Sequence, residues 1–181
     1  MSRIIVTEFL TLDGVMEAPH EWSFPYWNDE IARFKNDEIL ATGALLLGRV
    51  TYEGFAAAWP SRKDETGFAD RMNSLPKYVV STTLDDVEWN NSKLIKENVA
   101  GEVSKLKREG GQDIVVHGSR TLVQTLIEEN LVDEYRLLVY PLVLGSGIHL
   151  FGEGVRTNLQ LMNSKSFATG VIAQIYGPAA E

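Results

Sequence analysis

Residues 113–151 read DIVVHGSRTLVQTLIEENLVDEYRLLVYPLVLGSGIHLF, and this stretch decides the fold. Its apolar start, Ile114 to Val116, is typical of a strand that is buried on both faces. After a turn at 117–119, apolar residues recur at spacings of three and four up to Ile127, as on one face of a helix. A second apolar run covers 135–140. The stretch therefore predicts a strand, a tight glycine turn, a helix and a second strand.

The turn at Gly118 is a candidate anion site. A helix entered directly from a strand presents unpaired backbone N–H groups and a partial positive charge above the turn. On this stretch alone plain packing is the better explanation, because every such unit needs a small residue at its turn. A second junction, Gly48 followed by Arg49 and Thr51, favours a phosphate site, because the guanidinium fork of arginine suits a phosphate.

Length and composition limit the classes of function. The 181 residues are 44% apolar and 23% charged, which fits a single domain over 1–181. The absence of cysteine excludes disulfides, thiolate zinc sites and cysteine nucleophiles, and we expect no metal. A net charge of −8 without a Lys/Arg cluster argues against nucleic acid. No run is apolar enough to span a bilayer and the start lacks a signal-peptide pattern, so we expect no membrane and a cytoplasmic location.

The remaining periodic segments alternate between strands and helices. Asn28 is a candidate N-cap of a helix to Ala41, whose acidic residues, among them Glu30 and Glu38, are expected on a solvated face. A closing hairpin turns at Thr169-Gly170. Together these segments predict a three-layer α/β fold with a mainly parallel central sheet and an antiparallel C-terminal hairpin. The expected strands cover 4–12, 44–47, 78–80, 94–95, 159–168 and 171–176, and a further helix covers 99–106.

The loop over 15–27 is unusually rich in aromatic residues. Surface loops rarely carry so much ring area without a use. One interpretation is that the rings cover the core or enter a dimer contact. The other is that they line a pocket for a planar ligand.

Three turns resemble the dihydrofolate reductase fold: Gly48-Arg49-Val50-Thr51-Tyr52, Ser81-Thr82-Thr83 and Gly118-Ser119-Arg120. More closely, the chain resembles the reductase (C-terminal) domain of the bifunctional riboflavin-biosynthesis deaminase/reductase and its stand-alone relatives. That closer resemblance rests on Leu131-Val132-Asp133-Glu134-Tyr135, Pro141, Leu144-Gly145-Ser146-Gly147 and Leu150-Phe151. It extends over nearly the whole chain, from Ile4 to about Tyr176. The deaminase half of that enzyme needs cysteine zinc ligands, so the missing cysteines exclude that activity.

The resemblance implies NADPH as the cofactor. It assigns the cofactor's phosphates to Arg49 and Thr51 beside Gly48, its adenosine 2′-phosphate end to Ser81 and Thr82, and its pyrophosphate to Gly118, Ser119 and Arg120. Each group is a donor at the carboxyl end of a strand, where open α/β sheets bind ligands. The loop over 11–16 resembles the family's flexible segment beside the nicotinamide.

With NADPH, the expected reaction is hydride transfer to a C=N or C=O bond of a small substrate such as a pterin or an aminopyrimidine. Matching Phe34-Lys35 to the family's aromatic-basic pair makes Glu30 a candidate acid, although a solvated helix residue fits Glu30 equally; Asp13 is a second candidate. Two other hypotheses stay open: a nucleotide-binding protein without efficient turnover, and a structural dimer with a vestigial pocket. The relatives and the apolar run 137–144 favour a homodimer.

Overall fold

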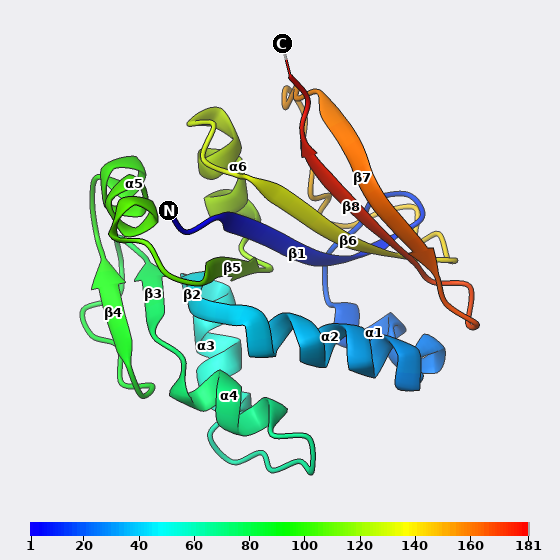
Figure 1. Cartoon of the computed structure of the whole chain (residues 1–181), viewed down its shortest axis with the longest axis horizontal. Helices are drawn as coiled ribbons and strands as arrows, with labels where there is room; N and C mark the ends of the chain where they lie inside the picture. The colour runs from blue at the N-terminus through cyan, green and yellow to red at the C-terminus, as the bar shows by residue number, and fades with distance from the viewer. Residues whose placement is uncertain (181) are drawn as a thin grey trace.

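One eight-stranded sheet runs through the computed structural model, which describes residues 1–180 (Figure 1). The strand order is β4-β3-β2-β5-β1-β6-β8-β7. The first six of these strands are parallel, whereas β8 pairs antiparallel with both β6 and β7. The strands are β1 (Ile4–Thr11), β2 (Thr42–Gly48), β3 (Lys77–Val80), β4 (Ser92–Ile95), β5 (Asp113–His117), β6 (Glu134–Tyr140), β7 (Leu159–Ser166) and β8 (Ile172–Pro178).

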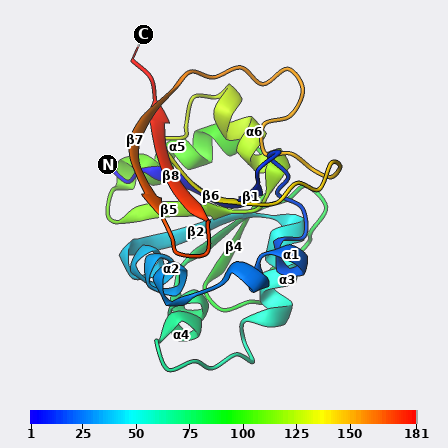
Figure 2. The same ribbon diagram turned by 90° about the vertical axis from the view of Figure 1, so that its right-hand side faces the viewer.

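Helices cover both faces of this sheet (Figure 2). The α6 face carries α5 (Val99–Glu109) and α6 (Arg120–Glu128). The α2 face carries α1 (Pro19–Trp22), the 3-10 helix η1 (Phe24–Tyr26), α2 (Asp29–Ala41), α3 (Arg49–Ala58) and α4 (Phe68–Ser74). This arrangement confirms the predicted three-layer α/β fold with an antiparallel C-terminal hairpin. None of the helices within residues 1–180 is long and apolar enough to cross a membrane.

Hydrophobic packing follows the two faces. Alternate residues of the central strands, such as Ile4, Val6 and Leu10 of β1, pack with α5 and α6. Leu45 and Leu47 of β2 face the other way, into a cluster with α3 and α4. Because both faces are covered, the central strands are apolar nearly throughout, which is why they lack the alternation of a half-exposed strand.

The start of α2 follows the predicted capping pattern. The Asn28 side chain accepts a hydrogen bond from the Ile31 backbone N–H at 3.0 Å. The solvated face predicted for this helix is wrong at Glu38, which is only 5% exposed and points into the fold. The segment before α2, predicted as a loop, contains the short helical turns α1 and η1.

Candidate functional site

The carboxyl ends of β2 and β5 form the topological switch point of the sheet. These two strands are neighbours, yet the chain leaves β2 into α3 on the α2 face and leaves β5 into α6 on the opposite face (Figure 1). In open α/β sheets, a crevice outside the strand ends forms where neighbouring connections diverge, and ligands bind there. The predicted turns at Gly48 and Gly118 both lie at this point.

Hydrogen bonds join the two turns. The Ser119 hydroxyl accepts from the Gly48 backbone N–H at 2.8 Å and donates to the His117 carbonyl at 2.8 Å. The Ser119 backbone N–H donates to Thr51 Oγ1 at 3.1 Å. Gly118 has a φ of +53°, and a Cβ there would lie 2.7 Å from Thr51 Oγ1. The turns therefore form one tightly packed rim, and glycine is needed at 118 on two separate grounds.

Two helices begin at this rim with free donor groups. The caps of α3 and α6, Gly48 and Ser119, make no side-chain capping bond to any group within residues 1–180. The first backbone N–H groups of both helices are therefore available to an anion, together with the positive ends of two helix dipoles. Arg49 and Arg120 are the first residues of these helices, so both leave from the same edge of the sheet.

The two arginines have weak partners. Arg49 pairs with Glu53 one turn along α3 at 2.9 Å, an exposed contact of the kind that contributes little. Arg120 donates from Nε to the His149 carbonyl at 3.1 Å, which ties the start of α6 to the loop after β6. A Cβ at Gly152 would lie 2.4 Å from Arg120 Nη2, so that loop packs closely on the guanidinium.

Ser81 and Thr82 follow β3, the strand next to β2, and lie at the same edge. The Ser81 hydroxyl accepts from the backbone N–H groups of Thr83 at 3.2 Å and Leu84 at 3.1 Å. Ser81 thus shapes its own turn, and Thr82 is exposed. The structure therefore brings all eight predicted cofactor residues to one edge of the sheet.

Asp13 connects two loops. Its carboxylate accepts from the Thr11 hydroxyl at 2.5 Å and from the Gly145 backbone N–H at 2.8 Å. The bond from Thr11, followed by that from Gly145, lowers the pKa of Asp13 to about 2. Its carboxyl is therefore ionised at neutral pH, and this geometry favours a positioning role over proton donation.

Glu30 lies away from the switch point. Its carboxylate accepts from the Ala168 backbone N–H in the β7–β8 hairpin at 2.9 Å, and that bond is the main reason why the pKa of Glu30 is lowered. The hairpin pairs with β6, which lies beyond β1 from β5. The structure therefore does not bring Glu30 to the predicted cofactor residues.

A buried polar cluster, missed in the sequence, lies on the α2 face beside the switch point. Lys35 and Glu38 of α2, which are 7% and 5% exposed, form an ion pair, and Lys35 Nζ donates to Thr7 Oγ1 at 2.9 Å. Thr7 is in register with His117 on β5 and with Arg136 on β6, whose guanidinium lies 3.6 Å from Glu38. Burial would raise the pKa of Glu38, but Lys35 reverses that effect and lowers it overall.

His117 is held neutral within this cluster. Burial first, and then the charge of Lys35, lower the pKa of His117 to about 3. Its ring lies 5.9 Å from that of Phe55, and its buried Nε2 has no hydrogen-bond partner among residues 1–180. His117 is therefore a neutral group with an open hydrogen-bonding position immediately before the Gly118 turn.

Glu8 is a second buried acid, on the α6 face of β1. It is 6% exposed, and its Oε1 has no partner anywhere in the described chain. Burial raises the pKa of Glu8 well above its ordinary value, and Lys35 only partly opposes this. The signal for buried Glu8 in the sequence was a lone charge within the apolar run from Ile4 to Leu12. The charges at 35 and 38, on the helix face of Ile31, were a similar signal for the cluster around Lys35.

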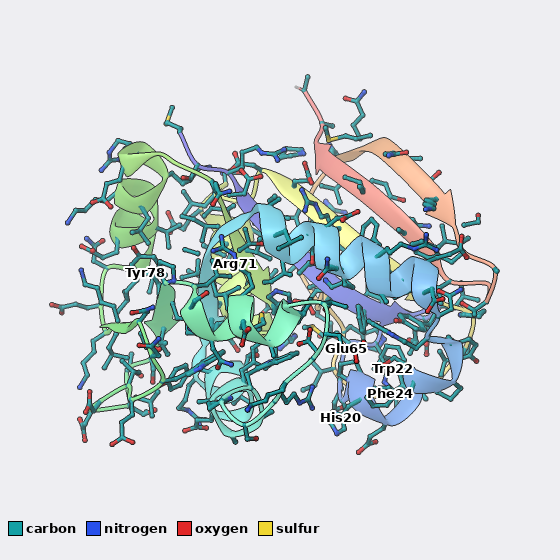
Figure 3. The ribbon with its side chains drawn as sticks, turned by 60° about the horizontal axis from the view of Figure 1, so that its bottom comes forward. His20, Trp22, Phe24, Glu65, Arg71 and Tyr78 are labelled. Carbon is teal, nitrogen blue, oxygen red and sulfur yellow. The ribbon has the colours of Figure 1, made fainter. Side chains whose placement is uncertain are left out.

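The rings of the aromatic loop divide between the core and the surface; Figure 3 labels two of them, Trp22 and Phe24, on the α1–η1 segment. Trp22 is buried and meets the Tyr140 ring edge-on at 5.3 Å, and Tyr26 does so at 5.8 Å. Phe24, from the same α1–η1 segment, is 67% exposed, and Trp27 is 42% exposed. Trp22 and Tyr26 thus fit the core-covering interpretation, whereas Phe24 and Trp27 remain available for contacts.

Two bacterial proteins resemble the chain along most of its length. Protein YyaP of Bacillus subtilis (strain 168), an uncharacterized protein, is 33% identical over 181 residues, which cover 96% of this chain and 94% of YyaP. Uncharacterized protein YwjB of the same organism is 32% identical over 169 residues, 90% of each chain.

Solved structures share the fold. A protein from Shewanella sp. PV-4, named for riboflavin biosynthesis, superposes with a TM-score of 0.78 at 19% identity and covers 98% of this chain and 99% of its own. A pyrimidine reductase-like protein of Corynebacterium diphtheriae gives 0.67 at 12% identity over 99% and 93%. The diaminohydroxyphosphoribosylaminopyrimidine deaminase/5-amino-6-(5-phosphoribosylamino)uracil reductase of Thermotoga maritima gives 0.68 at 12% identity, with 98% of this chain matching 57% of that protein.

The model of the RibD C-terminal domain matches residues 2–173. This range contains both turns of the switch point and the whole parallel part of the sheet. The chain therefore belongs to the RibD C-terminal domain family.

Proposed function

We propose that the protein is an NADPH-dependent reductase that transfers hydride to a C=N or C=O bond of a small heterocyclic substrate, such as a pterin or an aminopyrimidine. The observation that carries this proposal is the joined pair of turns at Gly48 and Gly118, which places two free helix N-termini side by side. Membership in the RibD C-terminal domain family supports it. So does the fold shared with the Thermotoga protein, whose name includes an aminouracil reductase.

The residues at the rim fit a dinucleotide. A pyrophosphate needs several converging N–H donors that a side chain does not block, and Gly118 with its positive φ leaves that space open. Arg49 and Arg120 would add guanidinium groups, and Ser81 and Thr82 would reach the 2′-phosphate end. When bound, NADPH supplies the hydride, and the protein's part is to orient the ring, exclude water and supply a proton.

Local donors must overcome the charge of the whole protein. The net charge of −8 repels a polyanion at long range, but that repulsion is screened beyond about 8 Å at physiological salt. Charge-assisted hydrogen bonds each contribute about 1.5–3 kcal/mol. Affinity should therefore depend on a few donors at the rim, which makes single substitutions informative.

Titration with NADPH tests the assignment. Arg49→Ala and Arg120→Ala should each weaken binding about tenfold or more, because one charge-assisted bond exceeds 1.4 kcal/mol. Arg108→Ala is the matched control: Arg108 is exposed near the end of α5, which leads into the opposite edge of the sheet, and its loss should leave affinity unchanged. Equal NADPH affinities for all three variants would show that the cofactor pocket is wrongly assigned.

A nucleotide-binding protein of the same fold without efficient turnover is the alternative. The bonds of Asp13 to Gly145 and of Glu30 to Ala168 favour it, because both predicted acids are occupied by loop contacts. Steady-state NADPH oxidation with a panel of pterins and aminopyrimidine sugars separates the two. A protein with a vestigial pocket would differ from both, because it would fail to bind NADPH at all.

A cytoplasmic homodimer is part of this proposal. Exposed apolar residues that could form a contact between copies include Val143 and Leu144 after β6 and Leu161 and Met162 on β7. Light scattering during size-exclusion chromatography measures the oligomeric state, and cell fractionation measures the location. A mass near 20.2 kDa in solution would contradict the dimer.

A further inference from the structure

The Glu8 carboxyl lies where the pairing between β1 and β5 ends. β1 and β5 pair up to Thr7 and His117, so Glu8 is level with Gly118, the first residue after β5. Strand alternation places Glu8 on the face of Val6, among the apolar residues beneath α6. The Gly118 backbone N–H lies close enough to favour its ionised form. Glu8 therefore borders the same turn that carries the proposed cofactor site.

The charged groups near Glu8 favour opposite ionisation states for the carboxyls of Glu8 and Glu38. Lys35 and Glu38 of α2 act on Glu8 electrostatically from the opposite face of the sheet, and His117 belongs to the neighbouring β5. Lys35 is committed to its ion pair with Glu38, whereas Glu8 lacks a cation of its own within residues 1–180. Glu38 is consequently ionised and Glu8 stays neutral, since an unpaired buried carboxylate would cost several kcal/mol. Two acids whose environments separate them in this way are typical of acid–base sites.

We propose that Glu8 is the catalytic proton donor of the reduction. This inference rests on the proposed function. The hydride forms a C–H bond at the substrate carbon, and the π electron pair of the C=N or C=O bond moves to the heteroatom. That atom would take the proton from the Glu8 carboxyl, and the positive charge of the oxidised cofactor would favour the carboxylate that remains. A proton from solvent then restores the acid.

The other candidates lack a proton to give. Asp13 is ionised at neutral pH, and Glu30 accepts a bond at the distant hairpin. His117 is neutral, and a neutral imidazole is far too weak an acid to give up its N–H proton. Glu8 lies beside the turn and retains its proton. One of its carboxyl oxygens has no hydrogen-bond partner within residues 1–180.

The ratio of NADP⁺ to NADPH affinity tests this assignment without a substrate. A carboxyl that touches the nicotinamide should ionise when the ring is positive and stay protonated when it is neutral. NADP⁺ binding should then release a proton, and the affinity ratio should rise up to about tenfold per pH unit in the window where Glu8 is neutral in the free protein. The 2′-phosphate titrates in both nucleotides and cancels in the ratio.

Calorimetric titrations from about pH 5 to about pH 9 would measure this ratio. We expect a rising ratio in the wild type and in Glu128→Gln, an exposed control at the end of α6, and a flat ratio in Glu8→Gln. Glu8→Gln should fold, since the amide replaces an acid that is already neutral. Glu8→Met is a second non-ionisable variant should the amide perturb the site.

The outcomes separate this inference from the proposed function. Binding of both nucleotides with a flat wild-type ratio, or with the same slope in Glu8→Gln, overturns the role of Glu8 and leaves the cofactor assignment intact. A wild-type protein that binds neither nucleotide overturns the proposed function, and the role of Glu8 falls with it.

Discussion

Gly118→Ala should destabilise the protein by about 2–3 kcal/mol. The first part is backbone strain, because an L-residue with a Cβ pays about 1–2 kcal/mol in the left-handed region that Gly118 occupies. The second part is a clash, because the new Cβ would lie 2.7 Å from Thr51 Oγ1. Thr51 can relieve it by rotating, but its hydroxyl then loses the bond from the Ser119 N–H, worth about 1 kcal/mol.

A double-mutant cycle with Thr51→Ala separates these two parts. Thr51→Ala alone removes the same hydrogen bond and should cost about 1 kcal/mol. The double variant has the strain but has lost that bond only once, so its cost should again be about 2–3 kcal/mol rather than the sum of the single costs. The expected coupling energy is therefore about 1 kcal/mol in favour of the double variant.

Urea unfolding with a constant slope measures all three costs. Gly54→Ala is the matched control, because Gly54 lies inside α3 and a Cβ there would meet no atom of residues 1–180 within 4 Å. That change should stabilise the protein by about 0.5–1 kcal/mol. Strictly additive costs at Gly118 and Thr51 would refute the claim that the two turns are packed through this contact.

Three further perturbations test the buried cluster and the loops. Lys35→Met should cost about 3–5 kcal/mol because it leaves buried Glu38 with only the longer contact to Arg136, and adding Glu38→Leu should recover much of that loss in urea unfolding. The wild-type contribution of ionised Glu38 is present above the ordinary carboxyl range and is lost as pH falls, because its folded pKa is lowered. His117 has a folded pKa of about 3 against 6.5 unfolded, so stability should fall as pH drops through that window, by up to about 1.4 kcal/mol per unit, and His117→Gln should flatten this slope. Asp13→Asn should speed hydrogen exchange at the Gly145 amide, and unchanged exchange would contradict the loop connection.

Most of the secondary structure could be predicted because its causes are local. The three-and-four spacing up to Ile127 depends only on neighbouring residues, and the structure has α6 there. The Asn28 cap likewise needs only the next three residues. The convergence of Gly48 and Gly118 was also foreseeable in part, since the carboxyl ends of parallel strands share one edge. The adjacency of β2 and β5, however, depends on strand order, which local patterns do not encode.

The buried charges could not be predicted because their partners are distant. Lys35 bonds to Thr7, 28 residues away, and Glu30 bonds to Ala168, 138 residues away. An acidic residue on a helix is solvated unless something covers it, and the sequence near Glu38 does not say what covers it. The lone charge of Glu8 in an apolar strand and the charges at 35 and 38 on the helix face of Ile31 were visible anomalies, but neither pattern names the partner.

The position of Glu8 also explains how its proton could be kept until it is needed. The net charge of −8 and the phosphates of a bound dinucleotide both disfavour a further negative charge, so they act in the same direction as burial and hold Glu8 neutral. A positive charge that develops on the nicotinamide would act in the opposite direction. Because the interior is poorly screened, that change in sign would be felt strongly at the carboxyl. Hydride departure and proton release would then be coupled by electrostatics alone, without any movement of the strand that carries Glu8.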